Sequence, residues 1–436
     1  MTPDPAIMKS VEKLGYRVSV GDVASHAGLE INQAQKGLLA LAADAGGHLQ
    51  VAESGEIAYL FPKNFRSILR NKFWQLRWQE WWERVWGVLF YLIRISFGII
   101  LVISILLMVA AIAIILIAMS NSEGEGDSGG GSSRRGGGFS FPGIWFFPDI
   151  FWIFDPSYDH RQVRSRRSSN DSEKGMNFLE AIFSFLFGDG DPNVNLEERR
   201  WQAIGGVIRN YNGAIAAEQI APYCDEISAI NLENEDYVLP ALARFNGYPQ
   251  VSDVGEIIYY FPELQISATR KGEQSVAPYL KEKSWRFSSA SSGQVMLAIG
   301  LGAANLILAM VLGSLLQGNL AAELGGLVAF VDSIYWLLLG YGSAFLAVPL
   351  IRYFWIQYQN SRIESRNQKR SGYLSLLNSA SVKLQEKLAY AKHFAAHKVI
   401  DEENLAYTTQ TDLLEQDINR SEQIDAQWER RLESGS

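Results

Sequence analysis

Few residues in this sequence combine a reactive type with a spacing that could support chemistry. His393 and His397 are four positions apart, which places them on one face of a helix, and Asp401 follows one turn later. Two imidazoles and a carboxylate can bind zinc, but no HExxH pattern surrounds them, and two histidines on a charged helix are more often solvated. We therefore predict no metal and no cofactor.

A catalytic centre is not indicated elsewhere in the sequence. Cys224 is the only cysteine, so one chain can form neither a disulfide nor a four-thiolate metal site. The glycine-rich stretches 129–131 and 188–190 lack the Lys-Ser/Thr pair of a phosphate-binding loop. No nucleophile–base pair stands out, and we predict that the protein is not an enzyme.

Two polar residues lie within long apolar runs. Asn305 is inside one run, and Asp332 is near the start of another. Polar and ionisable groups inside a membrane are candidates for function. Asp332 is close enough to the end of its run to reach the membrane interface, so a structural role is the simpler interpretation. A channel or transporter subunit that uses Asn305 and Asp332 in an oligomer stays open as an alternative.

The soluble-looking elements contain an internal duplication. Residues 47–62 read GHLQVAESGEIAYLFP and residues 247–262 read GYPQVSDVGEIIYYFP, with 9 of 16 positions identical and no gap. Each stretch has two alternating runs around a Gly-Glu turn, which predicts a β-hairpin. Three short helical patterns precede each hairpin. We therefore predict two winged-helix-like modules, residues 1–64 and 193–268.

The use of these modules follows from their charge. The chain carries a net charge of −8, and the position of the third helix offers only Lys36 in copy one and Glu233, Glu235 and Asp236 in copy two. DNA phosphates would repel such a surface, so the sequence argues against nucleic acid as a partner. We predict protein–protein contact instead, through the following hairpin residues: Glu56, Tyr59, Glu256 and Tyr259.

A helix rich in tryptophan and arginine follows the first module. Trp74, Trp78 and Trp81 form one helical stripe, with Trp82 beside it, directly before a long apolar run. This composition is typical of a helix in the headgroup region of a membrane, although it would also suit a helix that caps a core. We predict an interfacial helix over residues 65–94.

Three apolar runs are long enough to cross a bilayer. Residues 95–119 contain no charge, and residues 295–351 hold two further runs joined by a short loop, so we predict one transmembrane helix followed by a helical hairpin. Small residues such as Gly302, Gly313 and Gly342 would allow close packing within the hairpin. Residues 352–436 are charged and predict a soluble helical tail.

The linker 120–192 decides the topology. Lys and Arg gather before the first and second runs and after the third, and the loop 317–326 has none. By the positive-inside rule both modules and the tail are cytoplasmic or stromal, and the sequence has no signal peptide to move the first module. A shared side requires a second crossing, for which the aromatic segment 139–154 is a short or re-entrant candidate; modules on opposite faces are the alternative.

The repeated GEIAYLFP and GEIIYYFP, the tryptophan-rich helix and the C-terminal hairpin with its basic tail resemble a family of cyanobacterial and chloroplast integral membrane proteins. Some members are labelled as iron–sulfur cluster biosynthesis proteins. The resemblance implies a thylakoid or plasma-membrane location and a link to photosynthetic or respiratory complexes. The residues do not support the iron–sulfur label, because one cysteine cannot hold a cluster unless chains combine.

These observations predict a mainly α-helical membrane protein with a non-enzymatic role. We expect a membrane-anchored scaffold, assembly or regulatory factor whose partners are membrane lipid and the subunits of another membrane complex. A homo-oligomer, an oligomeric channel and a membrane-bound DNA-binding regulator are the alternatives that the sequence leaves open.

Overall fold

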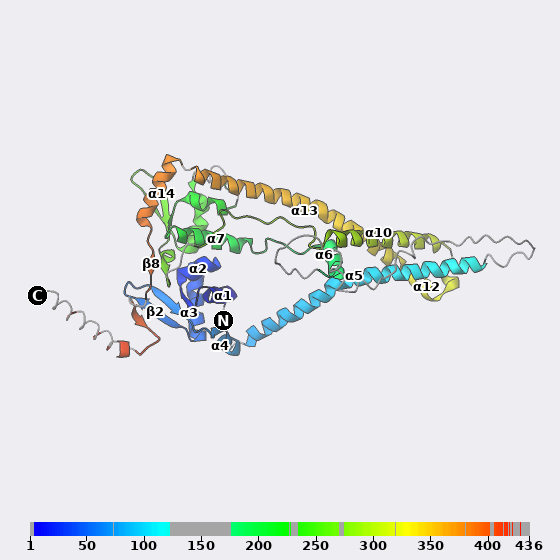
Figure 1. Cartoon of the computed structure of the whole chain (residues 1–436), viewed down its shortest axis with the longest axis horizontal. Helices are drawn as coiled ribbons and strands as arrows, with labels where there is room; N and C mark the ends of the chain where they lie inside the picture. The colour runs from blue at the N-terminus through cyan, green and yellow to red at the C-terminus, as the bar shows by residue number, and fades with distance from the viewer. Residues whose placement is uncertain are drawn as a thin grey trace, which may run out of the picture. The chain divides into compact units, whose positions relative to one another are not determined.

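The computed structural model describes residues 4–72, 74–122, 176–225, 227, 234–269, 274–318, 320–379, 381–401 and 405–412, with isolated residues beyond. The chain is mainly helical and has a few small sheets (Figure 1), which confirms the predicted fold class. It divides into two compact units. Unit 1 comprises residues 1–82, 193–284 and 362–436, and unit 2 comprises residues 83–192 and 285–361.

Module 1 of unit 1 has the expected order of helices followed by a hairpin, with a short first strand between the helices. A Ser19–Asp22 capping box starts its second helix, and Gly28, in the left-handed conformation, ends it. Glu30 precedes the third helix and makes no side-chain capping bond. The elements are α1 (Pro5–Lys13), β1 (Arg17–Ser19), α2 (Val20–Ala27), α3 (Ile31–Ala45), β2 (His48–Ala52), β3 (Ile57–Leu60) and α4 (Phe65–Lys72).

Module 2 repeats the hairpin with the same register. Leu49 faces Tyr59 across the first hairpin, and Pro249 faces Tyr259 across the second. The strand order is β1-β3-β2 in one sheet and β4-β6-β5 in the other. Its elements are α7 (Leu196–Asn210), β4 (Ala214–Ile215), η4 (Ala217–Gln219), η5 (Ala221–Tyr223), η6 (Asp236–Val238), α9 (Leu239–Phe245), β5 (Tyr248–Val251), β6 (Ile257–Tyr260), η7 (Pro262–Gln265) and β7 (Ile266–Ser267).

The two modules differ in their second helix. The sequence predicts one helix over residues 217–223, but the structure has two 3₁₀ turns there, η4 and η5. Pro222 lacks the N–H that an α-helix needs at this point, and Cys224 is already extended. The physical difference is therefore local and does not change the order of the strands.

The modules pack directly on each other inside unit 1. A Cβ atom added at Gly205 would lie 2.9 Å from Ser25 Cα, and one added at Gly28 would lie 2.9 Å from Trp201 Cβ. The small residues thus let α2 and α7 approach closely. One continuous hydrophobic core contains residues of both modules, among them Val11, Leu38, Phe245 and Phe261.

The tail contains helices, as expected for residues 352–436, and adds two short strands. It contains α14 (Val382–Phe394), β8 (Lys398–Val399) and β9 (Leu405–Thr408). Strand β9 pairs with the outer edge of β2 in module 1, and β8 pairs with β7 of module 2. Figure 1 shows the tail in orange and red beside the strands of both modules. The alternation in these short strands is too brief to be read without their partners.

The tryptophan-rich segment and the first apolar run form one helix. Helix α5 (Trp74–Ser122) has 49 residues and is about 74 Å long, so no break separates the predicted interfacial helix from the predicted span. No proline lies within α5. A glycine such as Gly87 destabilises a helix by only about 1 kcal/mol relative to alanine. Residues 65–94 thus contain α4 and the first part of α5, and their place at a membrane interface stays a prediction.

Among the described residues, three helices are long and apolar enough to cross a membrane by length and composition: α5, α10 (Ser292–Leu315) and α13 (Tyr335–Asn378). Helices α11 (Leu320–Leu324) and α12 (Gly326–Ser333) form the return from α10 to α13. The predicted span 327–351 is thus split at Ile334, where the backbone leaves the helical region. Helix α13 also continues without a break into the predicted tail.

Small residues seat aromatic rings within unit 2. A Cβ atom at Gly302 would lie 2.4 Å from the Phe345 ring, and one at Gly313 would lie 2.1 Å from the Tyr335 hydroxyl. The short apolar helix α6 (Phe178–Phe187) packs against α10. The candidate return segment 139–154 lies outside the described residues.

Candidate functional site

The hairpin tyrosines that the sequence proposes as contact residues lie inside their modules. Tyr59 and Tyr259 are 3% and 6% exposed. The Tyr259 hydroxyl donates to Glu235 Oε2 at 2.8 Å. Burial raises the pKa of both phenols, and the bond to Glu235 adds to the effect at Tyr259. The tyrosines therefore stabilise the modules and offer no surface to another protein, which corrects this assignment.

The repeated glutamates at the hairpins contact the chain's own tail. Lys398 Nζ lies 2.9 Å from Glu56 Oε1, and Lys383 Nζ lies 3.1 Å from Glu256 Oε1. Both lysines are largely exposed, so each pair contributes about 0–1 kcal/mol. The same acid in each copy is thus neutralised by a lysine from the tail. Contact of these glutamates with another protein stays a prediction.

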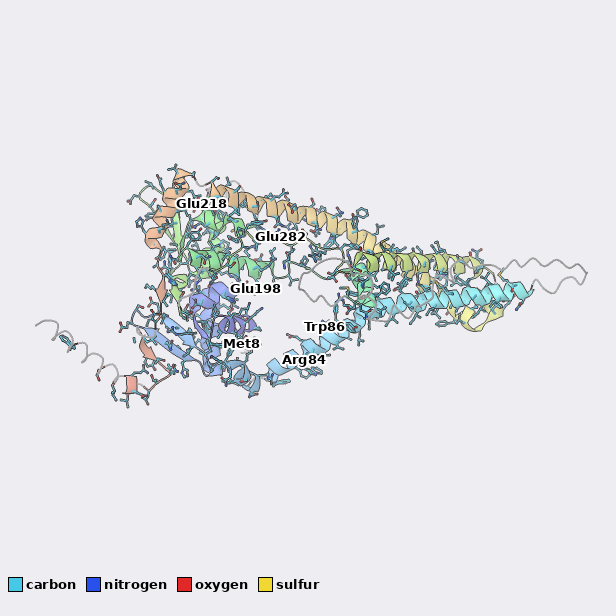
Figure 2. All side chains as sticks on the ribbon, viewed as in Figure 1. Met8, Arg84, Trp86, Glu198, Glu218 and Glu282 are labelled. Carbon is cyan, nitrogen blue, oxygen red and sulfur yellow. The ribbon has the colours of Figure 1, made fainter. Side chains whose placement is uncertain are left out.

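A buried lysine anchors helix α14 to module 2. Lys387 is 2% exposed, and its ammonium pairs with Glu218 at 3.1 Å and with Glu235. A lysine enclosed by two carboxylates is stable only while the carboxylates remain ionised. Figure 2 labels Glu218 in this region of unit 1. The tail is therefore fastened to module 2 by charge as well as by packing.

A second buried pair joins the modules to each other. Arg209 Nη1 lies 2.7 Å from Asp22 Oδ1, and both side chains are at least nine-tenths buried. Asp22 Oδ2 also accepts the backbone N–H of Ala268 at 2.9 Å. Arg17 donates to the carbonyl oxygens of Ala268 and of Ile400 in the tail. Module 1, module 2 and the tail thus meet at these few polar groups.

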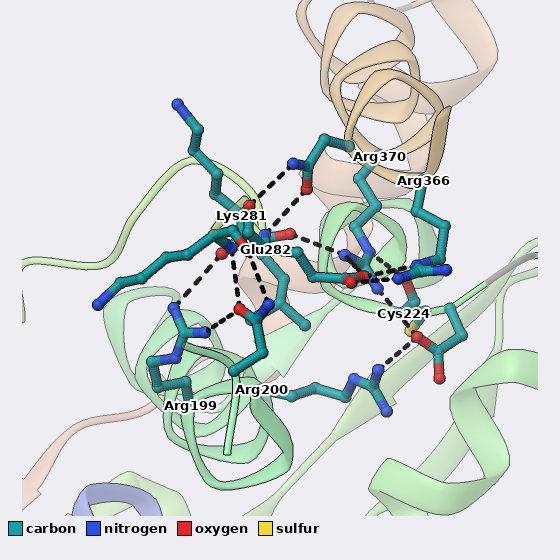
Figure 3. A network of polar contacts seen from close by, with 12 residues as sticks. Arg199, Arg200, Cys224, Lys281, Glu282, Arg366 and Arg370 are labelled. Carbon is teal, nitrogen blue, oxygen red and sulfur yellow. Dashed lines mark hydrogen bonds and ion pairs between the residues drawn. The ribbon is translucent and has the colours of Figure 1, made fainter. Parts of the chain in front are cut away.

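The largest polar network lies where α13 meets the segment after module 2 (Figure 3). Glu282 accepts from Arg366 Nη2 at 2.5 Å and from Arg370 Nη1 at 2.7 Å. Arg370, itself 2% exposed, also reaches Asp225 at 3.0 Å, and Asp225 pairs with Arg200. Burial acts to raise the pKa of Glu282, but its two arginines outweigh burial and lower the pKa below its usual value.

Asparagine 367 completes this network with a two-way contact to the backbone. The N–H of Glu282 donates to Asn367 Oδ1 at 2.9 Å, and Asn367 Nδ2 donates to the Glu282 carbonyl at 2.9 Å. The segment after module 2 is thus held in register along α13. The charges balance, because three arginines meet Glu282, Asp225 and Glu197. A network with paired charges and backbone contacts is typical of a structural role.

The single cysteine lies within the same network but is not activated by it. Burial raises the pKa of Cys224 to about 12, and this effect exceeds the opposing effect of Arg200. Its thiol donates to the Ile220 carbonyl at 3.4 Å. A thiol in this state is a poor nucleophile and a poor metal ligand, because both roles require the thiolate.

The third helices expose an apolar residue at the same position in both copies. Leu39 of α3 is 53% exposed. Its counterpart in α9 is Leu239, 200 residues later, which is 59% exposed. The base of α9 is used internally: the Arg244 guanidinium stacks on the Trp201 ring at 4.5 Å and donates to the Gly28 carbonyl. The helix that would read DNA therefore presents leucine and not arginine.

The tryptophan stripe is present on α5. The rings of Trp74 and Trp78 lie 6.0 Å apart, and those of Trp78 and Trp81 lie 5.2 Å apart. These rings and Trp82 are all at least half exposed. Figure 2 labels Trp86 and Arg84 further along the same helix. Exposed rings in a row suit contact with lipid headgroups.

The two polar residues of the apolar runs have different environments in unit 2. Asn305 is fully buried and donates to Ser104 of α5, while its Oδ1 atom has no partner among the described residues. Asp332 is exposed at the end of α12. Among the described residues, no hydrogen bond joins the two side chains, and Asn305 links α10 to α5.

The predicted metal candidates are not assembled. His393 contacts the Tyr390 ring, and His397 Nε2 lies 3.2 Å from Ser267 Oγ. Within the described part of the chain, no group of three metal-binding side chains comes together.

The buried charges are the residues that the sequence did not reveal. Leu384 and Ala391 are buried on one face of α14, and Lys387 lies between them on the same face. A lysine inside an apolar stripe is a usable signal for a buried pair. Arg370 gives no such signal, because its neighbours Lys369 and Ser371 are polar.

Comparison with known proteins gives one informative similarity. No family model matches the chain, and no solved structure matches it. The sequence is 38% identical over 438 residues to an uncharacterised chloroplastic protein of Arabidopsis thaliana, and the alignment covers 98% of this chain and 81% of that protein. The chain therefore belongs to the same family as this chloroplastic protein.

Proposed function

We propose that the chain is a non-enzymatic protein of a chloroplast-type membrane, in which two winged-helix-like modules scaffold, assemble or regulate another membrane complex. The chloroplastic relative supports this location. A thylakoid membrane fits the chloroplastic relative and the long apolar helices. The three long apolar helices serve as the anchor.

The exposed leucines of the third helices carry this proposal. Leu39 and Leu239 occupy the same position in two modules that share a single core. Lone exposed leucines are ordinary on a protein surface, but the repetition at one position of a duplicated module gives a protein partner two equivalent apolar contacts.

The composition of unit 1 supports a shared side of the membrane. Both modules and the tail belong to this one unit, and the lysines and arginines near the spans favour the stromal or cytoplasmic side. A shared side then requires an even number of membrane crossings between the two modules.

Affinity purification from solubilised membranes tests the proposal. We expect the full-length chain to recover specific membrane proteins, and the double change Leu39→Glu and Leu239→Glu to reduce that recovery at least fivefold, because each glutamate places a charge in an apolar contact. Val194→Glu is the matched control, since Val194 is 76% exposed but lies outside both third helices.

A solitary chain without co-purifying protein would count against the scaffold. Equal losses in the leucine variant and in the Val194 control would show that the recovered proteins do not bind through the third helices. Recovery of DNA in a salt-dependent manner by the intact protein would favour the regulator alternative.

A further inference from the structure

Two arginines of unit 2 mark the ends of charge-free runs and meet at one turn. Arg94 is the last charged residue before residues 95–119, and Arg352 is the first after residues 333–351. The turn is Gly188–Asp189, directly after α6. Residues at the end of an apolar run lie at the headgroup level of a bilayer. Both cations are therefore placed at one depth.

Arg352 is held against this turn by backbone and ring contacts. It donates to the Ser184 carbonyl at 3.2 Å and to the Phe287 carbonyl, and its guanidinium stacks on the Phe287 ring at 4.4 Å. Gly188 has φ of +82°, and a Cβ there would lie 3.3 Å from Arg352 Nη1. The glycine leaves room for the guanidinium.

Arg94 approaches the same turn from α5. Its Nη2 lies 3.3 Å from Asp189 Oδ1, and its guanidinium lies 5.6 Å from the Phe183 ring centroid. Asp189 is also occupied elsewhere, because its Oδ2 accepts from Ser184 Oγ and from the Ser289 N–H. Two guanidinium groups thus face one carboxylate that is already shared, and the site keeps a positive charge.

Both arginines have donors that the described residues do not satisfy. The Nε atoms of Arg94 and Arg352 are buried and have no partner in the part of the chain that the structure describes. A guanidinium offers five N–H donors, whereas hydrogen bonds to the described residues use one donor at Arg94 and two at Arg352. An acceptor with several anionic oxygens is the chemistry that such a pair recognises.

Aromatic side chains close in sequence to Arg352 indicate that this part of unit 2 lies at the membrane interface. The Trp285 and Trp355 rings are 5.1 Å apart, and the Phe287 and Tyr353 rings are 6.2 Å apart. Phe354 is 64% exposed beside them. A belt of this kind is typical of the headgroup region, so the acceptor nearest to the arginines would be a lipid headgroup.

We propose that Arg94, Arg352 and the Gly188–Asp189 turn form a binding site for the headgroup of an anionic lipid, either a phospholipid or a sulfolipid. The phosphate or sulfonate oxygens accept from the free guanidinium N–H groups, and the acyl chains lie along α5, α6 and α13. The site also explains why Asp189 alone does not neutralise the two cations. It does not depend on the proposed scaffold function.

Lipid retention by the purified full-length chain tests the site. We would exchange the protein into detergent with phosphatidylglycerol or phosphatidylcholine and count bound lipids by native mass spectrometry. The wild-type chain should retain phosphatidylglycerol over phosphatidylcholine, and Arg94→Gln should reduce that retention about tenfold, the value of a charge-assisted hydrogen bond. Arg352→Gln should do the same.

Arg286→Gln is the matched control. Arg286 is an exposed cation next to Trp285 and Phe287 but outside the turn, so its loss should change retention twofold or less in 150 mM salt. Equal losses in all three variants would reduce the site to surface attraction and overturn it. Displacement of the lipid by millimolar inorganic phosphate would assign the pair to a free anion instead.

Folding does not confound this test. Arg94 makes a single hydrogen bond to the described residues, so Arg94→Gln should keep the melting temperature of the lipid-free chain. Added phosphatidylglycerol should raise the melting temperature of the wild-type chain and not that of Arg94→Gln. An identical rise in both would contradict the proposal even if Arg352→Gln failed to fold.

Discussion

At the scale of single residues, buried charges do most to define unit 1. Arg370 and Glu282 are both almost fully buried, and Arg370 Nη1 lies 2.7 Å from Glu282 Oε1. Removal of one member leaves a buried charge unpaired, whereas removal of both does not. This asymmetry can be measured.

We expect Arg370→Met to destabilise unit 1 by about 3–5 kcal/mol, because Glu282 then keeps only the partly exposed Arg366. The double change Arg370→Met and Glu282→Leu should recover most of this loss. Urea unfolding of the full chain in detergent, followed by tryptophan fluorescence, is the measurement. A double variant as unstable as the single one would show that packing, and not the unpaired charge, dominates.

The lowered pKa of Glu282 predicts how stability depends on pH. The native carboxylate holds its proton less tightly than the unfolded one, whose pKa is near 4.5. Its contribution is therefore complete above that value and is lost as the pH falls through the lower native pKa. Thermal melts from pH 6 downward should decline less steeply in Glu282→Gln than in the wild-type chain. Parallel curves would contradict this assignment.

The raised pKa of Cys224 predicts an unreactive thiol. At pH 8.5 a pKa of about 12 makes the native thiolate rarer than that of a free cysteine by roughly three orders of magnitude. Alkylation with iodoacetamide should thus be very slow in the native chain and fast after denaturation. Mass spectrometry of the labelled peptide provides the readout, and rapid labelling of the native protein would exclude a buried thiol.

At the scale of elements, one proline distinguishes the two hairpins. Leu49 donates its N–H to Thr409 Oγ1 and accepts from the Thr409 N–H, so its backbone faces β9. Pro249 holds the same register position in β5 and has no N–H to donate. Proline is tolerated at a strand edge and discourages the addition of a further strand. The tail therefore extends the first sheet and covers the second with α14, where Tyr390 donates to the Val251 carbonyl.

We expect Leu49→Pro to release β9 from the sheet, because it removes the donor that binds Thr409. Hydrogen exchange at residues 405–408 should accelerate about tenfold, whereas exchange in β3 should change little. Pro249→Leu is the mirror control and should leave β9 protected. Unchanged protection in Leu49→Pro would show that side-chain contacts alone hold the strand.

The sequence was sufficient for elements with strong local signals. Both hairpins are predictable from the sequence, because the Gly-Glu turns and the alternation on either side of them are local signals. Strand β9 was not predictable, since its partner is more than 350 residues away. The continuity of α5 and α13 is not predictable from composition, because a change from polar to apolar residues does not mark the end of a helix.

The candidate site shows the same division. The sequence identified Glu56 and Glu256 as a repeated feature but could not supply the lysines that pair with them. The buried network around Arg370 depends on three segments that are distant in sequence, so no local pattern indicates it. The tryptophan stripe of α5, by contrast, follows directly from helical spacing.

At the scale of the whole molecule, the membership of unit 1 predicts the topology. Both modules and the tail belong to it, so reporter fusions at Ser122 and Lys271 should report opposite sides of the membrane. Fusions after residue 40 and after residue 412 should report the same side as Lys271. Identical signals at Ser122 and Lys271 would place the modules on opposite faces and contradict the shared side.

The pairing of β9 with β2 can form only late in synthesis, because β9 lies near the end of the chain. Gln50 pairs with Thr408. A ribosome that adds 5–20 residues per second synthesises Thr408 roughly 20–70 s after Gln50. Throughout that interval the edge of β2 is open and Glu56 has no lysine. A nascent chain of this family thus carries an unpaired strand while its apolar helices are inserted, and chaperones or proteases can distinguish unfinished from finished molecules by that edge.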